Sequence, residues 1–334
     1  MTESTTGVRT LCICIPTYKR PALLARCLDS IIRQADGLPL RVYVCDDSCS
    51  DINDSVMAAA MARLPAIRYE RNPRNLGINE NIRKVIGGCG GDVAWPVGED
   101  DFFLPGALAR ACREIQAFRG PFVMCNYAFV GDDDSGLGPL ALSLPADIDM
   151  SAEAFIAQYL WATGFMGACL IDVAAWHRVQ TDRYRGTWYA HVGHIVEMLG
   201  HREQAVRVIV EPMVANRATD RSFFTWRAHE LDVLLGFERM CARAAEAVPD
   251  LAYSLRRAAL VWRDKQHHLS MRSLARMRAD GAISADLYQR ELKPIDMPAR
   301  TRLYILLLCT TPRFVFRAVR AVKQSAKFGL TKSG

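Results

Sequence analysis

The sequence feature that most constrains the fold is a pattern that repeats over the first 127 residues: a short apolar run, a polar cluster, then an amphipathic stretch. Short apolar runs bounded by turn signals are typical of buried strands, and the stretches between them are typical of helices. The runs span residues 11–15, 40–45, 66–69, 92–97 and 121–127. Alternation of this kind predicts an α/β fold, with a mainly parallel sheet covered by helices on both faces.

Polar clusters follow four of the predicted strands. They are Thr17-Tyr18, Asp46-Asp47, Arg71 and Glu99-Asp100-Asp101. One such cluster alone would be a helix cap or a turn. In parallel sheets, however, ligands bind outside the carboxyl ends of the strands. Four clusters at one rim of the sheet therefore predict a ligand-binding site.

The acidic triplet at residues 99–101 adds a constraint of its own. Three consecutive carboxylates repel one another and are costly at a buried strand end without a counter-charge. A hard divalent cation such as Mg²⁺ or Mn²⁺, which takes oxygen ligands, is the usual remedy. The alternative is a solvated acidic turn. The clusters on the neighbouring strands favour the cation.

Charge and cysteine usage narrow the class of protein. The net charge is +6, and the segment from residue 313 onward holds six bases and no acid, so the rest of the chain is near neutral and predicts no nucleic-acid partner. The eleven cysteines contain no Cys-x-x-Cys spacing, and Cys12 and Cys14 share one strand face. This usage predicts reduced thiols that fill the core of a cytosolic protein.

The C-terminal third is helical in pattern and has no catalytic spacing. Bases from Arg313 to Lys327 alternate with apolar residues from Phe314 to Val322, as in an amphipathic helix that lies on an anionic membrane. The alternative is a solvated helix that covers the core. No apolar segment approaches the length that spans a bilayer, and residues 1–10 lack a signal-peptide core. These features predict a cytoplasmic protein, peripheral on the inner face of the cell membrane.

Four ordered motifs between residues 10 and 127 resemble those of family 2 glycosyltransferases. They are residues 14–20 (Cys-Ile-Pro-Thr-Tyr-Lys-Arg), 46–51 (Asp-Asp-Ser-Cys-Ser-Asp), 75–77 with Asn81, and 98–101 (Gly-Glu-Asp-Asp) with Pro105. The last of these, with the later Tyr-x-Gly-x-Trp-Tyr-x-His stretch, looks most like abequosyltransferase-type enzymes of O-antigen synthesis. The resemblance implies a GT-A fold, which is Rossmann-like, followed by a helical C-terminal region. We expect a flexible segment at 1–9, the catalytic domain at 10–215, a helical subdomain at 216–300 and a membrane-associating tail at 301–334.

The resemblance also implies roles for individual residues. Those expected to bind the nucleotide are Pro16, Thr17, Tyr18, Arg20, Asp46, Asp47, Arg71, Asn75, Asn81 and Glu99. Asp100 and Asp101 are expected to bind Mn²⁺ or Mg²⁺ between themselves and the diphosphate of a UDP, TDP or CDP sugar. Gly98 departs from the family pattern because it replaces the first Asp of the Asp-x-Asp signature, and Glu99 is expected to substitute in part.

The general base is harder to place, because the Glu-Asp pair that commonly supplies it in the family is missing here. His191 is the predicted base, since imidazole titrates near neutral pH; the alternative is a hydrogen-bonded structural histidine. Asp182 and Glu197 are the rival bases. Trp188 and Tyr189 are predicted to stack on a sugar ring, or else to be core aromatics.

Together these features predict an inverting, metal-dependent glycosyltransferase that acts on a polyprenyl-diphosphate-linked saccharide in bacterial surface polysaccharide synthesis. A sugar-nucleotide nucleotidyltransferase is the first alternative, but the loop after the first strand lacks the glycines that such enzymes use to hold a triphosphate. A non-catalytic relative that binds only nucleotide or membrane is the second. This second alternative remains because Gly98 replaces a signature Asp and the Glu-Asp pair that commonly supplies the base is missing.

Overall fold

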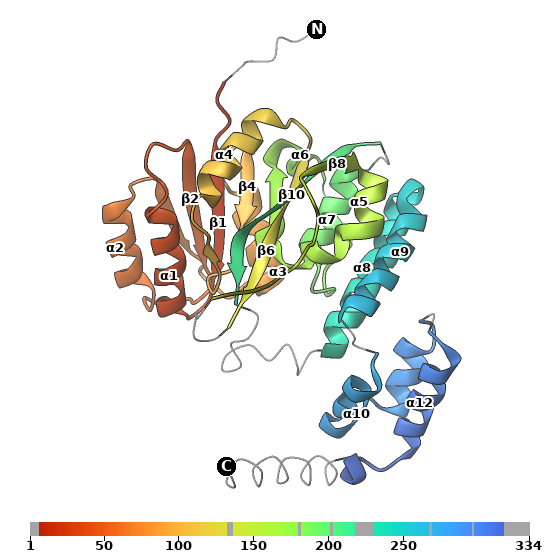
Figure 1. The fold of residues 1–334 in the computed structure, drawn as a ribbon. Helices are drawn as coiled ribbons and strands as arrows, with labels where there is room; N and C mark the ends of the chain where they lie inside the picture. The colour runs from red at the N-terminus through yellow and green to blue at the C-terminus, as the bar shows by residue number, and fades with distance from the viewer. Residues whose placement is uncertain are drawn as a thin grey trace, which may run out of the picture.

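The computed structural model describes residues 7–131, 136–179, 182–200, 203–217, 230–266, 269–295 and 297–316. A twisted sheet forms the centre of the molecule, with helices on both faces, and the C-terminal helices extend from one side of it (Figure 1).

The N-terminal half of the sheet is parallel, as predicted. Its strand order is β3-β2-β1-β4, with Leu11 of β1 in register with Leu40 of β2 and Val93 of β4. The strands are β1 (Leu11–Thr17), β2 (Leu40–Asp46), β3 (Ile67–Arg71) and β4 (Val93–Pro96), connected by α1 (Pro21–Ile32), α2 (Asp54–Arg63) and α3 (Ile78–Gly87). Helices α1 and α2 pack together, while α3 packs on β1 and against α6 and α7. Every residue of β1 is buried, as expected of a strand covered on both faces.

The other half of the sheet mixes directions. The full order is β3-β2-β1-β4-β9-β6-β10-β5, in which β9 runs antiparallel between β4 and β6. The elements here are β5 (Phe102–Phe103), α4 (Ala107–Ala117), β6 (Phe122–Val130), β7 (Leu137–Leu140), β8 (Ile148–Ser151), β9 (Cys169–Asp172) and β10 (Ala205–Asn216). The prediction of a mostly parallel α/β sheet with a helical C-terminal region is confirmed. The antiparallel insertion of β9 has no signal in the local sequence.

Helices from both halves of the chain cover the second half of the sheet. Helix α9 packs against α5 and α8, and α8 packs against α7. These are α5 (Ala152–Tyr159), α6 (Val173–Arg178), α7 (Ala190–Leu199), α8 (Glu230–Ala247) and α9 (Ala252–Gln266), with short turns at Leu160–Gly164, Met166–Ala168 and Pro249–Leu251.

The last helices, α10 (Met271–Asp280), α11 (Ala285–Leu287) and α12 (Ala299–Thr310), pack on one another, and a single turn at Tyr288–Leu292 follows α11. Helix α12 leaves Leu303, Leu306 and Leu307 exposed. None of the helices described by the structure is long and apolar enough to cross a bilayer. The predicted basic amphipathic helix starts in the turn at 313–316, and the rest of it, 317–327, lies outside the described residues.

Candidate functional site

The polar clusters predicted at the carboxyl ends of the strands meet at one rim of the sheet. Thr17 of β1 is in register with Asp46 of β2, which is in register with Arg71 of β3. The loop after β1 also touches the acidic triplet, because the backbone N–H of Tyr18 donates to Glu99 Oε2 at 2.7 Å. The structure therefore brings together the four clusters that the sequence separates.

The acidic triplet follows β4 and is unevenly buried. The side chain of Asp100 is 30% exposed, whereas Glu99 and Asp101 are each 7% exposed. Arg20 pairs with Asp100 at 3.1 Å and reaches Glu99 at 3.5 Å. Asp101 Oδ1 instead accepts the backbone N–H of Arg217 at 3.2 Å.

Burial makes negative charge unfavourable in this triplet. Desolvation raises the pKa of Glu99 to about 7, against hydrogen bonds that favour its charged form. Desolvation, with the neighbouring Asp100 charge, raises the pKa of Asp101 well above its usual range. The triplet therefore lacks the counter-charge that would keep all three carboxylates ionised.

Gly98 explains how two of these carboxylates come together. A Cβ at this position would lie 2.7 Å from Asp100 Oδ1 and 2.8 Å from Asp101 Oδ2, so both oxygens converge over the glycine. Two hard oxygen donors in an under-neutralised site fit Mg²⁺ or Mn²⁺, which proteins usually hold with one or two carboxylates plus substrate phosphates. The glycine that departs from the family signature is thus the residue that makes room for the pair.

The acidic pair Asp46-Asp47, at the end of β2, differs from the triplet because hydrogen bonds fill its acceptor positions. Asp46, fully buried, accepts the Ser48 N–H at 2.8 Å, the Asn53 amide at 2.9 Å and the Tyr69 hydroxyl at 2.8 Å. Asp47, 3% exposed, accepts the backbone N–H groups of Leu76 and Gly77 at 2.8 and 2.9 Å and the Asn72 amide at 2.9 Å. An N–H group of a nucleotide, the predicted ligand of Asp47, would have to share one of these acceptor positions.

The other predicted nucleotide ligands differ in access. Tyr18 is 44% exposed, and Arg71 is at the surface in an ion pair with Asp54. Asn75 is exposed, and its Oδ1 accepts the Gly77 N–H at 2.7 Å. Asn81 is buried and donates to the Cys45 carbonyl at 3.0 Å. Pro16 and Thr17 are buried in β1. Tyr18, Arg71 and Asn75 are therefore the members of this set that a ligand can reach directly.

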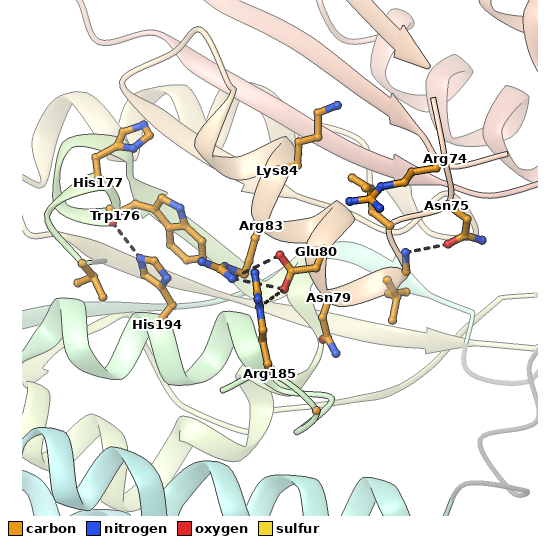
Figure 2. A pocket seen from close by; sticks show the side chains of 15 residues that line it. Arg74, Asn75, Asn79, Glu80, Arg83, Lys84, Trp176, His177, Arg185 and His194 are labelled. Atoms are coloured by element: carbon orange, nitrogen blue, oxygen red, sulfur yellow. Dashed lines mark hydrogen bonds and ion pairs between the residues drawn. The ribbon is translucent and has the colours of Figure 1, made fainter. Parts of the chain in front are cut away.

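A cleft of about 1010 Å³ adjoins this rim. One wall is the loop of residues 74–77, held by Asp47, together with the first turns of α3; the other is the end of α6 and the loop before α7 (Figure 2). Glu80 of α3 pairs with Arg83 at 3.4 Å and with Arg185 at 3.2 Å across the cleft (Figure 2). No sequence signal marked these two arginines, because they come together only when α3 and α7 pack.

The three predicted bases lie in different surroundings. Asp182 is 62% exposed and pairs with Arg83 at 2.9 Å. Glu197 is 17% exposed and accepts the Tyr184 hydroxyl at 2.7 Å. His191 is 4% exposed, its Nε2 donates to the Thr163 carbonyl at 3.1 Å, and burial lowers its pKa to about 4. The surroundings of His191 favour the alternative role as a structural histidine, because the ring is enclosed and takes up a proton only in acid.

The two residues predicted to stack on a sugar, Trp188 and Tyr189, differ in burial. Tyr189 is 4% exposed, and its ring packs edge-on against Phe237 and Trp262 at centroid distances of 5.2 and 5.6 Å. Tyr189 is therefore a core aromatic, which was the alternative, and its ring has no face for a sugar. Trp188 is half-buried and has a positive φ of 64°.

Comparison with known proteins gives a family match over part of the chain. Residues 12–167 match the model described as glycosyl transferase family 2. Abequosyltransferase RfbV of Salmonella typhimurium is 24% identical over 225 residues, which are 63% of this chain and 67% of that protein. An uncharacterized protein of Mycobacterium tuberculosis, MT1568, is 38% identical over 104 residues, and the match spans only 32% of its length.

Solved structures share the fold at low sequence identity. TarS 1–349 of S. aureus in complex with UDP-GlcNAc has a TM-score of 0.56 and 13% identity, covering 94% of this chain and 92% of that one. The mannosyltransferase PcManGT of Pyrobaculum calidifontis, in complex with GDP-Man and Mn²⁺, has a TM-score of 0.50 and 16% identity, covering 94% and 87%.

Proposed function

The chain belongs to glycosyl transferase family 2, and we propose that it transfers a sugar, with inversion, from a nucleoside-diphosphate sugar to a lipid-linked saccharide. The observation that carries this proposal is the pair of carboxylates, Asp100 and Asp101, which converge over Gly98 at the rim of the sheet. A diphosphate with a divalent cation is the ligand chemistry that this under-neutralised pair suits.

The donor site follows from the same rim. Asp100 and Asp101 would hold the cation, and Tyr18, Arg71 and Asn75, which are exposed at the same rim, would contact the nucleoside. A bound divalent cation stabilises the negative charge that develops on the diphosphate leaving group. The names of two structural neighbours, with UDP-GlcNAc and with GDP-Man and Mn²⁺, support a nucleotide sugar and a metal for this fold. We propose Mn²⁺ or Mg²⁺ here, and a UDP, TDP or CDP sugar.

The acceptor enters from the side of the cleft that precedes α7. Of the three predicted bases, Asp182 has the exposure that proton transfer from an incoming hydroxyl requires, and it sits beside Arg83 and Arg185, which line the cleft. We therefore assign the base to Asp182 in preference to His191 and Glu197. Asp182→Asn should lower the transfer rate while leaving donor affinity nearly unchanged; a larger effect of His191→Ala on rate, with normal donor affinity, would return the assignment to His191.

A lipid-linked acceptor needs an enzyme that reaches the membrane surface. Helix α12 exposes Leu303, Leu306 and Leu307, and Phe314 is 70% exposed at the start of the basic segment. Exposed leucines next to bases suit the surface of an anionic leaflet. The name of the relative RfbV, an abequosyltransferase, supports a place in O-antigen-like polysaccharide synthesis. We propose a peripheral position on the inner face of the membrane.

Calorimetric titration of nucleoside diphosphates tests the donor site. UDP, TDP or CDP should bind in the presence of Mn²⁺, and Asp100→Ala should abolish that binding. Asp286→Ala, an exposed acid paired with Arg290 far along the chain, is the matched control and should bind normally. Absence of nucleoside-diphosphate binding would reject the proposal. Triphosphate binding with pyrophosphate release would indicate the nucleotidyltransferase, and binding without transfer to any acceptor would indicate the non-catalytic relative.

A further inference from the structure

Three cysteines meet below the rim, on the face of the sheet that α3 covers. Cys12 and Cys14 lie on β1, and Cys89 lies in the loop between α3 and β4. Their Sγ atoms are all within 4.8 Å of one another. Cys12 and Cys14 are 1% and 0% exposed, and Cys89 is half-buried, so the cluster is dry on the sheet side and accessible on the loop side.

The loop that carries Cys89 fits closely against β1. Its sequence from residue 87 to 91 is Gly-Gly-Cys-Gly-Gly. A Cβ at Gly91 would lie 2.8 Å from Cys12 Cβ and 2.9 Å from the Thr10 carbonyl oxygen, and one at Gly88 would lie 3.0 Å from the Lys84 carbonyl oxygen. Any other residue at Gly91 would push the loop away from the strand. The glycines therefore hold Cys89 at the distance where its sulfur meets the other two.

The thiols act on one another in this position. Hydrogen bonds from Cys12 and Cys14 lower the pKa of the Cys89 thiol to about 3, whereas the pKa of Cys12 is raised to about 12 and that of Cys14 is raised well above its usual value. A divalent cation that binds all three sulfurs would displace the protons that the thiols still carry. Thiolate sulfur is the form that binds soft and borderline metal ions.

The site also has an approach from solvent. A cleft of about 470 Å³ is lined by Gly91, Asp92 and His177. The imidazole Cε1 of His177 lies 3.7 Å from the Cβ position of Gly87, at the start of the same loop. None of the three cysteines lines this cleft, but Cys89 is itself half-buried, so water can reach the sulfur cluster from the loop side.

We propose that Cys12, Cys14 and Cys89 bind one zinc-type divalent cation, with the fourth coordination position filled by water from the loop side, where Cys89 is half-buried. Three thiolates and one nitrogen or oxygen ligand form a tetrahedral set of the kind that structural zinc sites use. A disulfide would use only two of the three sulfurs. The close approach of all three Sγ atoms therefore favours a metal ion. An ion bound there would link the loop of residues 87–91 to β1. It would thereby fix the position of the first residues of β4, and the acidic triplet follows the other end of that strand.

This site differs in ligand chemistry from the carboxylate pair at Asp100 and Asp101. Sulfur ligands select zinc-type ions, and carboxylate oxygens select Mg²⁺ and Mn²⁺. The proposal therefore stands or falls independently of the donor site.

Titration of the full chain, reduced and treated with chelator, tests the site with Zn²⁺ and with Co²⁺ as a spectroscopic probe. We expect one equivalent of Zn²⁺ to bind and to raise the unfolding temperature. We expect Co²⁺ to give the sulfur-to-metal charge-transfer band that only thiolate ligands produce. Cys89→Ser is the main variant because its side chain lies in a loop and is half-buried, and it should lose the band and the thermal shift. Cys49→Ser, at an exposed cysteine outside the cluster, should keep both.

Several results would overturn the proposal. The first is a Co²⁺ spectrum without a thiolate band in the wild-type chain. The second is an unchanged band in Cys89→Ser, with Cys89→Ala as a second variant should the serine hydroxyl bind the ion. A loss of two free thiols on mild oxidation, with no metal binding by the reduced chain, would instead identify a redox disulfide that involves Cys89.

Discussion

Two groups of acids stand on the same rim, on either side of β1, and their surroundings are opposite. Asp46 and Asp47, at the end of β2, are buried and accept hydrogen bonds from backbone N–H groups, amides and a hydroxyl. Glu99 and Asp101, after β4, are nearly as buried, yet burial raises the pKa of both. Carboxylates of the same chemical type thus have their hydrogen-bond acceptor positions filled at the end of β2 and lack counter-charge after β4.

The difference separates acids that hold the loops of the site in place from acids that are available to bind a cation. A carboxylate whose acceptor positions are filled by the chain holds loops in place, and removing it leaves several buried donors without partners. A buried carboxylate short of donors and counter-charge costs stability until a cation arrives. The acid pair should therefore matter first for stability, and the acid triplet first for function.

Asp101→Asn should give the largest effect and should separate function from stability. We expect transfer to fall about 10²- to 10³-fold, the size of effect seen when a group that stabilises transition-state charge is lost. The unfolding temperature in the absence of divalent ions should stay the same or rise, because the amide carries no buried charge. Steady-state transfer assays and thermal unfolding measure the two readouts, with Asp286→Asn as the control. A clear loss of stability would place Asp101 with the structural acids.

Asp47→Ala should give the next largest effect, and it should lower stability more than it lowers the transfer rate. The change leaves the N–H groups of Leu76 and Gly77 and the amide of Asn72 without their acceptor. We expect the free energy of unfolding to fall by about 2–4 kcal/mol, since each unsatisfied buried donor costs roughly 1–3 kcal/mol and water reaches part of the loop. Urea denaturation measures it, and Asp51→Ala, an exposed acid just beyond the same strand end, is the control. A change below about 0.5 kcal/mol would contradict the structural role.

The smallest effect should appear in the pH dependence of stability. The pKa of Glu99 is raised to about 7 from an ordinary value near 4.5, so the folded chain retains a proton that the unfolded chain has already released between these values. Its contribution to stability is therefore present in acid and is lost as the pH rises toward 7. Glu99→Gln should flatten the fall in stability between pH 5 and pH 7, by up to about 1.4 kcal/mol per pH unit for one full proton. An identical pH profile in the variant would show that Glu99 is ionised throughout this range.

The sequence predicted the rim well because its signals are local. Apolar runs define strands, and the residues that follow a strand in a parallel sheet must lie at its carboxyl edge, so the meeting of Thr17, Asp46 and Arg71 followed from order alone. Prediction was weaker at α7. The burial of Tyr189 depends on Phe237 and Trp262, which arrive from α8 and α9, and the burial of His191 depends on the turn that contains Thr163. No local pattern around residues 188–191 encodes these distant partners.

The cysteines show the same division. Cys12 and Cys14 lie two residues apart in one strand, so the sequence alone placed them on one face. Cys89 joins them because the glycine loop after α3 folds back onto β1. By itself the sequence determined the α/β class, the order of the strands that form the rim and the chemical types of the groups there, because periodicity and motif order act over short distances. Only the tertiary structure decided which acids are saturated, which histidine is enclosed and which thiols meet, because hydrogen-bond partners and burial come from segments far apart in the chain.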